Sequence, residues 1–122
     1  MINTKKTTQD ILQEEMLRER AAVLARAGER LAEAREKLRR IEQDIGEATA
    51  LLLQESATGE GGRQRLVGEI NKKIRAYNRQ REQVKTRYYY LIVTREAMGI
   101  IHHERLEEIY RTPPKKRPLA EQ

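Results

Sequence analysis

The two histidines of this chain, His102 and His103, are the side chains best suited to metal chemistry. His103 and Glu107 are four residues apart, so a helix would place both on one side, where they could share a metal ion. A di-iron site in a helical bundle needs a Glu-x-x-His pair from each of two helices, together with further carboxylates. That spacing does not occur in the sequence. We therefore interpret His102 as a residue of a helical seam and His103 as a solvent-exposed residue beside a carboxylate, and we expect no metal site.

Other catalytic patterns are also missing from the sequence. There is no cysteine, no Ser/His/Asp arrangement and no phosphate-binding glycine motif. The glycines of residues 59–62 are not followed by Lys-Ser or Lys-Thr, so they predict a turn. Acidic pairs such as Glu14 and Glu15 are consecutive, so on a helix they point in different directions. We expect no enzyme, no catalytic residue and no cofactor.

Basic residues are concentrated in one segment and in the C-terminal tail. Residues 63–87 contain nine basic residues against two acids, a net charge of +7. A basic strip of this kind can neutralise phosphates without reading a nucleotide sequence. The residues available for such nucleic-acid contacts are Lys72, Arg75, Arg79, Lys85, Arg87, Lys115, Lys116 and Arg117.

A structural role for the basic strip is the favoured alternative. An antiparallel pairing of helices would bring Arg75 and Arg79 near acids of the first half of the chain, and such charge matches are common along coiled-coil flanks. The acids concerned are Glu42, Asp44 and Glu47. The basic tail is then interpreted as a solubilising segment.

Two seven-residue repeats define the elements that position these side chains. The first consists of Leu17, Leu24, Leu31, Leu38, Ile45 and Leu52, and the second of Ile70, Tyr77, Val84, Leu91 and Met98. A strict seven-residue apolar repeat is typical of helices that pack as a coiled coil. Charged residues make up 36% of the chain and aromatic residues only 4%, which favours aliphatic seams over a compact aromatic core. The fold class expected is all-α, with two long antiparallel helices forming a helical hairpin.

Glycine and proline residues suggest where each element begins and ends. Thr7 and Asp10 have the spacing of a capping box, three glycines in four residues allow a reversal, and Pro113 ends the second helix. The segments expected are a disordered leader at 1–6, a hairpin at 7–112 with helices 7–57 and 63–111 around a turn at 58–62, and a basic, proline-containing tail at 113–122.

The open end of the expected hairpin carries more apolar surface than one seam can bury. Residues 88–93 are apolar or aromatic on every face of a helix, although a short strand is an alternative for them. A helix that is apolar all round is normally covered on all sides, so we expect dimerisation into a four-helix bundle. The expected interface residues are Val23, Tyr89, Tyr90, Ile92, Val93, Ile100 and Ile101.

These features favour a non-enzymatic protein–protein interaction module, such as a scaffold, an adaptor or a small chaperone. The expected partners are a second copy in a homodimer or a larger protein assembly. Nucleic-acid binding through residues 63–87 and the tail is the alternative. A third hypothesis is a hairpin whose tip enters a channel of a larger machine, with Glu55 and Glu60 as the only acids at the tip. No apolar run reaches the roughly 20 residues that span a bilayer, so we expect no transmembrane segment and a cytoplasmic location.

Overall fold

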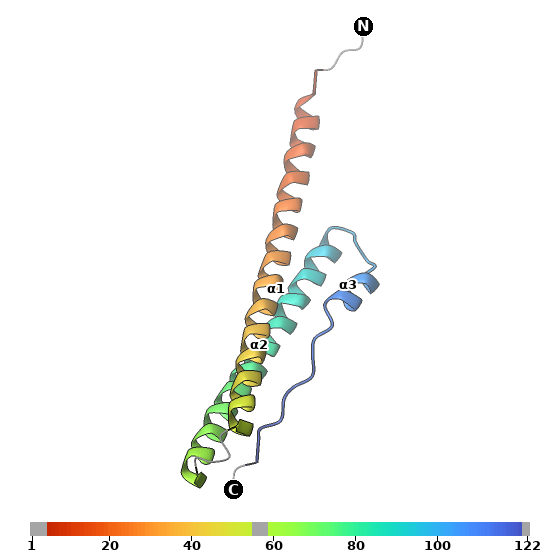
Figure 1. Ribbon diagram of the computed structural model, residues 1–122. Coiled ribbons are helices and arrows are strands. Elements are labelled where there is room, and N and C mark those ends of the chain that lie inside the picture. The colour runs from red at the N-terminus through yellow and green to blue at the C-terminus, as the bar shows by residue number, and fades with distance from the viewer. Residues whose placement is uncertain (1–4, 55–58, 121–122) are drawn as a thin grey trace.

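Two long antiparallel helices make up most of this computed structural model, which describes residues 5–54 and 59–120. Helix α1 spans Thr8–Gln54 and helix α2 spans Gly59–Ala97, and the two pack side by side along the length of α2 (Figure 1). The helical hairpin expected from the two repeats is therefore confirmed. The segment 88–93 is helical, so the strand alternative is wrong.

The core of the hairpin follows the seven-residue repeats. Helix α1 buries Leu31, Leu38, Ile45 and Leu52, four successive members of its repeat. The apolar side chains that α2 buries are Val67, Ile70, Ile74, Tyr77, Val84 and Leu91. Because seven residues are close to two helical turns, this spacing keeps the buried side chains of each helix directed at the other.

Helix α1 begins with the capping box expected from its sequence. The backbone N–H of Asp10 donates to Oγ1 of Thr7 at 3.1 Å, and the backbone N–H of Thr7 donates to Oδ2 of Asp10 at 3.1 Å. Each bond satisfies a donor that has no partner within the helix. The helix therefore has a defined start, although this end lies far from the buried core.

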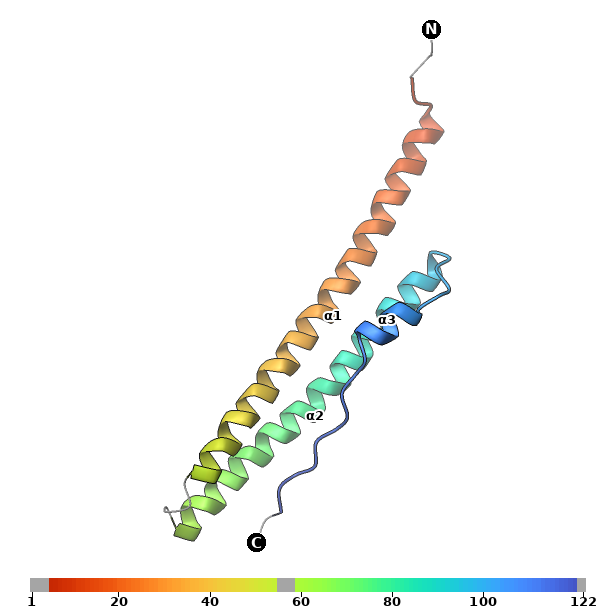
Figure 2. The same ribbon diagram turned by 45° about the vertical axis from the view of Figure 1, so that its right-hand side comes forward.

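The first part of α1 extends past the end of α2 (Figure 2). Apart from Glu14, every residue from Thr8 to Val23 is exposed, and Leu24 is the first half-buried member of the repeat. Leu17 was expected to lie in the seam, but its side chain is 64% exposed. That expectation is wrong because α2 ends before it reaches Leu17.

Helix α2 ends at Ala97, whereas the sequence predicted one helix over 63–111. Gly99 has a φ of +84°, a left-handed conformation that glycine adopts without a steric penalty. The N–H of Ile100 bonds to the carbonyl of Arg95 at 3.0 Å, and the N–H of Gly99 bonds to that of Glu96 at 2.9 Å. These two bonds form a Schellman motif, which satisfies the last carbonyls of a helix and turns the chain away.

A short helix and an extended segment follow this turn. Helix α3 spans Glu104–Ile109 and lies against the outside of α2. The extended segment, residues 111–120, runs back beside α2 towards the turn of the hairpin (Figures 1 and 2). We call residues 111–120 the strap. The tail interpreted as solubilising is thus packed against the hairpin over most of its length.

Some expected boundaries fall partly outside the described residues. Most of the leader expected at 1–6 lies there, as do the expected last residues of the first helix and Glu55. Within the expected turn at 58–62, residues 59–62 form the first turn of α2. In the part of the chain that the structure describes, no helix combines the length and apolarity needed to cross a membrane.

Candidate functional site

Exposed apolar side chains gather at the open end of the hairpin, where α2 stops and α1 continues alone. The overhanging part of α1 exposes Ile11, Leu12, Met16 and Leu17. The residues of the expected interface lie beside this overhang, with Val23, Tyr89, Tyr90, Val93 and Ile101 exposed and with Ile92 and Ile100 half-buried. The open end is therefore more apolar at its surface than the sequence repeats alone suggested.

One flank of the open end is hollowed between α1 and α2. Val23 and Ala27 of α1 and Tyr90 of α2 line this hollow, which has a volume of about 470 Å³. Its remaining lining residues are Arg26, Arg30, Arg87 and Thr94. Among the described residues these three arginines make no ion pair, so the hollow combines apolar walls with uncompensated positive charge. We call it the flank hollow.

Helix α3 covers a different part of the hairpin. The rings of Tyr110 and Tyr88 lie 6.5 Å apart between centroids, and the guanidinium of Arg35 lies 4.8 Å from the centroid of Tyr110. Leu106 packs against the buried core from α3. Burial raises the pKa of Tyr88 above its usual range, with the charge of Glu107 adding to the effect. Part of the aromatic surface of residues 88–93, which one seam cannot bury, is thus covered within the chain.

The two histidines lie in the turn between α2 and α3. Nε of Arg95 donates to Nδ1 of His103 at 3.3 Å, and Nε2 of His103 lies 3.3 Å from Oε1 of Glu96. The guanidinium of Arg95 also donates to the carbonyl oxygen of His102 at 3.1 Å. Both ring nitrogens of His103 therefore have partners in the last turn of α2. The His103 side chain is 13% exposed rather than fully solvent-exposed, and His102, expected in the seam, is exposed.

The described residues contain no group of three or more His, Cys, Asp or Glu side chains that could hold a metal ion. His103 and Glu107 are joined by a helical backbone bond, from the N–H of Glu107 to the carbonyl of His103. The ring of His103 is engaged by Arg95 and Glu96 instead. The two histidines thus stabilise the turn between α2 and α3.

Two asparagines of α2 bind the main chain of the strap. The side-chain amide of Asn78 donates to the carbonyl of Lys116 at 2.9 Å and accepts the N–H of Lys116 at 2.9 Å. Asn71 makes the same pair of bonds with Leu119, at 3.0 Å and 2.7 Å. Arg81 adds a bond from Nε to the carbonyl of Pro113 at 2.7 Å.

The spacing of these contacts matches the geometry of an extended chain against a helix. Seven helical residues rise about 10.5 Å, and three residues in a polyproline II conformation rise about 9.3 Å. Asn71 and Asn78 therefore meet strap residues three positions apart. Pro113, Lys116 and Leu119 are half-buried, whereas the prolines and basic residues between them are exposed. This three-residue period is that of polyproline II.

The side chain of Lys116 contacts both helices of the hairpin. Its Nζ lies 4.9 Å from the ring centroid of Tyr77 and 3.5 Å from Oε1 of Glu42. Tyr77 is buried, and burial, with a smaller contribution from the charge of Glu42, raises its pKa. One of the residues proposed for nucleic-acid contacts is thereby used inside the fold.

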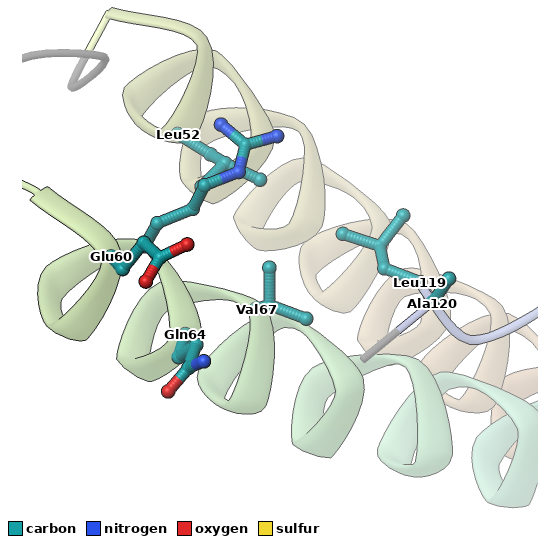
Figure 3. Close-up of a pocket in the computed structure, with 7 residues that line it drawn as sticks. Leu52, Glu60, Gln64, Val67, Leu119 and Ala120 are labelled. Atoms are coloured by element: carbon teal, nitrogen blue, oxygen red, sulfur yellow. The ribbon is translucent and has the colours of Figure 1, made fainter. Parts of the chain in front are cut away.

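The end of the strap reaches a second hollow near the turn of the hairpin (Figure 3). Leu119 and Ala120 line it together with Leu52 of α1 and Val67 of α2, and Glu60, Arg63 and Gln64 complete the lining. Leu52 and Val67 were expected to meet across the seam, and they line this hollow from the two helices. The strap thus closes one side of the hairpin from α3 to the loop end.

The other basic residues of the candidate strip remain at the surface. Lys72, Arg75 and Arg79 are exposed on α2. Nζ of Lys72 lies 3.6 Å from Oε1 of Glu69. Arg75 and Arg79 were expected to pair with acids of the first helix. Within residues 5–54 and 59–120 neither makes an ion pair, and Glu42 is paired with Lys116. That pairing expectation is wrong because the strap, rather than the outer face of α2, approaches Glu42.

The rest of the candidate set is divided between the strap and α2. Arg87 lines the flank hollow. Lys85 and Lys115 each lie 3.9 Å from a carboxylate oxygen of Glu82, and Arg117 is exposed. Five of the eight basic residues thus lie on α2, and the other three belong to the strap.

Sequence reasoning missed the strap and the exposed overhang of α1. The seven-residue spacing of Asn71 and Asn78 was a signal for the strap, because it places two side-chain amides on the same side of α2. The early end of α2 was signalled by Gly99, a glycine that follows a helical stretch.

Comparisons of the chain with protein-family models, with curated proteins and with solved structures gave no match.

Proposed function

We propose that this protein is a non-enzymatic interaction module that assembles through the open end of its hairpin. The observation that carries the proposal is the uncovered start of α1, where four large apolar side chains are about half exposed or more. A helical segment of some 15 residues is marginally stable alone in water, because most helix stability in proteins comes from packing of an apolar face. A partner that covers this segment would supply that packing.

The partner proposed is a second copy of the chain, which would give the four-helix bundle expected from the sequence. The exposed residues of the expected interface lie next to the overhang, so both surfaces could be covered by one partner. Neighbouring apolar side chains at a surface are typical of interaction sites. The proposal includes the cytoplasmic location expected from the sequence.

Light scattering or sedimentation at tens of micromolar tests this function. We expect a dimer for the natural sequence and a monomer for Leu12→Glu, which places a charge among the exposed apolar side chains. Leu53→Glu is the matched control, because Leu53 is 76% exposed at the other end of α1. A monomeric natural protein, or equal effects of the two substitutions, would contradict the proposal.

Nucleic-acid binding is the second candidate. It is supported by Arg75 and Arg79, which are exposed and make no ion pair within the described part of the chain. A gel shift at two salt concentrations tests it, because phosphate binding weakens steeply with salt. Absence of a shift at low salt, or a shift that Arg75→Ala and Arg79→Ala leave unchanged, would argue against α2 as a nucleic-acid surface.

A further inference from the structure

One face of α1 carries separated blocks of negative and positive charge around an apolar centre. Steps of three and four residues place these side chains on one side of the helix. They are Leu12, Glu15, Met16, Glu19, Val23, Arg26 and Arg30, and all of them are exposed. We call this set the charged face.

In the described part of α1, the charges of this face are arranged as two pairs of like charge. Glu15 and Glu19 are four residues apart and repel each other, as do Arg26 and Arg30. Among residues 5–54 and 59–120, none of the four makes an ion pair. One pair on this surface is negative and the other is positive. When a second copy of the helix lies antiparallel to the first, the negative pair of each copy faces the positive pair of the other.

We infer that two copies of the protein pair through the charged face in antiparallel orientation, with Glu15 opposite Arg30 and Glu19 opposite Arg26. Both pairs belong to the same register, because a step of four residues forward on one helix is a step of four backward on the other. The twofold axis then passes between Ala22 and Val23. In such an isologous contact each charge pair occurs twice. The inference rests on the proposed function and adds the partner surface and its register.

The flank hollow provides a second argument for this register. It lies beside Arg26 and Arg30, where the partner's acidic overhang would be placed. In this register the overhang would place Met16, which is 51% exposed, at the level of Glu29, next to Ala27 and Arg30 of the hollow. Arg87, from α2, adds a third positive charge to the hollow. Apolar contact and charge complementarity therefore favour the same occupant.

Charge reversal tests the pairing with the full-length chain. We expect Glu15→Lys with Glu19→Lys to make the charged face wholly basic, and Arg26→Glu with Arg30→Glu to make it wholly acidic. Each variant alone should weaken self-association on the order of 100-fold, since four attractive contacts become repulsive. An equimolar mixture of the two variants should form a heterodimer at least as stable as the natural dimer.

The matched control is Asp44→Lys with Glu47→Lys, two exposed acids on α1 near the loop end. It changes the net charge by the same amount as Glu15→Lys with Glu19→Lys and should leave the dimer intact. Circular dichroism checks that every variant is helical. A natural dimer that both charge-reversal variants leave intact would overturn this inference while the proposed function stands. A monomeric natural protein would overturn both.

Discussion

Replacing Asn78 by alanine removes both hydrogen bonds that hold Lys116 of the strap to α2, at 2.9 Å each. Each neutral hydrogen bond contributes about 0.5–1.5 kcal/mol, so the two together contribute about 1–3 kcal/mol. Alanine raises the helix propensity at this position by about 0.5 kcal/mol. Water can also reach the half-buried main chain of Lys116. We therefore expect Asn78→Ala to weaken the attachment of the strap to α2 by about 1–2 kcal/mol of free energy.

The loss should appear first as local release of the strap. Amide hydrogen exchange at Lys116 should accelerate about tenfold, because 1.4 kcal/mol corresponds to a factor of ten in an equilibrium constant. Amides in the buried middle of α1 should change much less. Urea unfolding, followed by circular dichroism, would measure any effect on the whole hairpin.

Gln83→Ala is the control for this experiment, since Gln83 is an exposed amide on α2. Its replacement should change stability by less than about 0.5 kcal/mol and leave exchange at Lys116 unchanged. If Asn78→Ala left the exchange of Lys116 at the natural rate, the asparagine bonds would not be what holds the strap, and the reasoning would be refuted.

Three further predictions concern the backbone, a buried tyrosine and the start of α1. Gly99→Ala should destabilise the protein by about 1 kcal/mol in urea unfolding, because its φ is +84°. Gly46→Ala should stabilise it by up to about 1 kcal/mol, because an added Cβ meets no atom within 4 Å in the helix; the same sign for both would contradict this account. Burial raises the pKa of Tyr77, so the unfolded chain loses this proton first and stability should fall as pH rises above about 10. Tyr77→Phe should reduce that alkaline loss in urea unfolding, and an unchanged pH dependence would refute it. Thr7→Ala should cost about 1 kcal/mol of local helix stability, measured by hydrogen exchange in the first turn, and Asp10→Ala should have a similar effect.

The hairpin could be predicted from the sequence because its core is periodic. Leu31, Leu38, Ile45 and Leu52 recur every seventh residue, and this spacing directs all of them to one partner helix. Side-chain periodicity is a local property, so it can be read without knowing the three-dimensional structure. The same repeat wrongly predicted that Leu17 is buried, because the length of α2 decides whether a seam position is covered.

The strap could not be predicted in the same way. Its main attachments run from Asn71 and Asn78 to the main chain of Leu119 and Lys116, and a main-chain contact leaves no mark on the strap's own sequence. The turn at Gly99 brings the strap back to α2, and a single glycine within a helical pattern was insufficient to predict a reversal. The candidate interface was found from composition, because apolar residues on every face exceed what one seam can bury.

The strap also determines how the molecule would respond to a pulling force. The described chain begins at the open end of the rod and finishes near its loop end (Figure 1), so tension between these points runs almost parallel to α2. Under such tension the bonds from Asn71, Asn78 and Arg81 are sheared together rather than broken one after another. A force applied sideways to the end of the strap would instead open the bonds of Asn71 first. The rod should therefore be stiff along its axis and easy to peel from its side, a mechanical asymmetry that arises from two asparagines and one arginine.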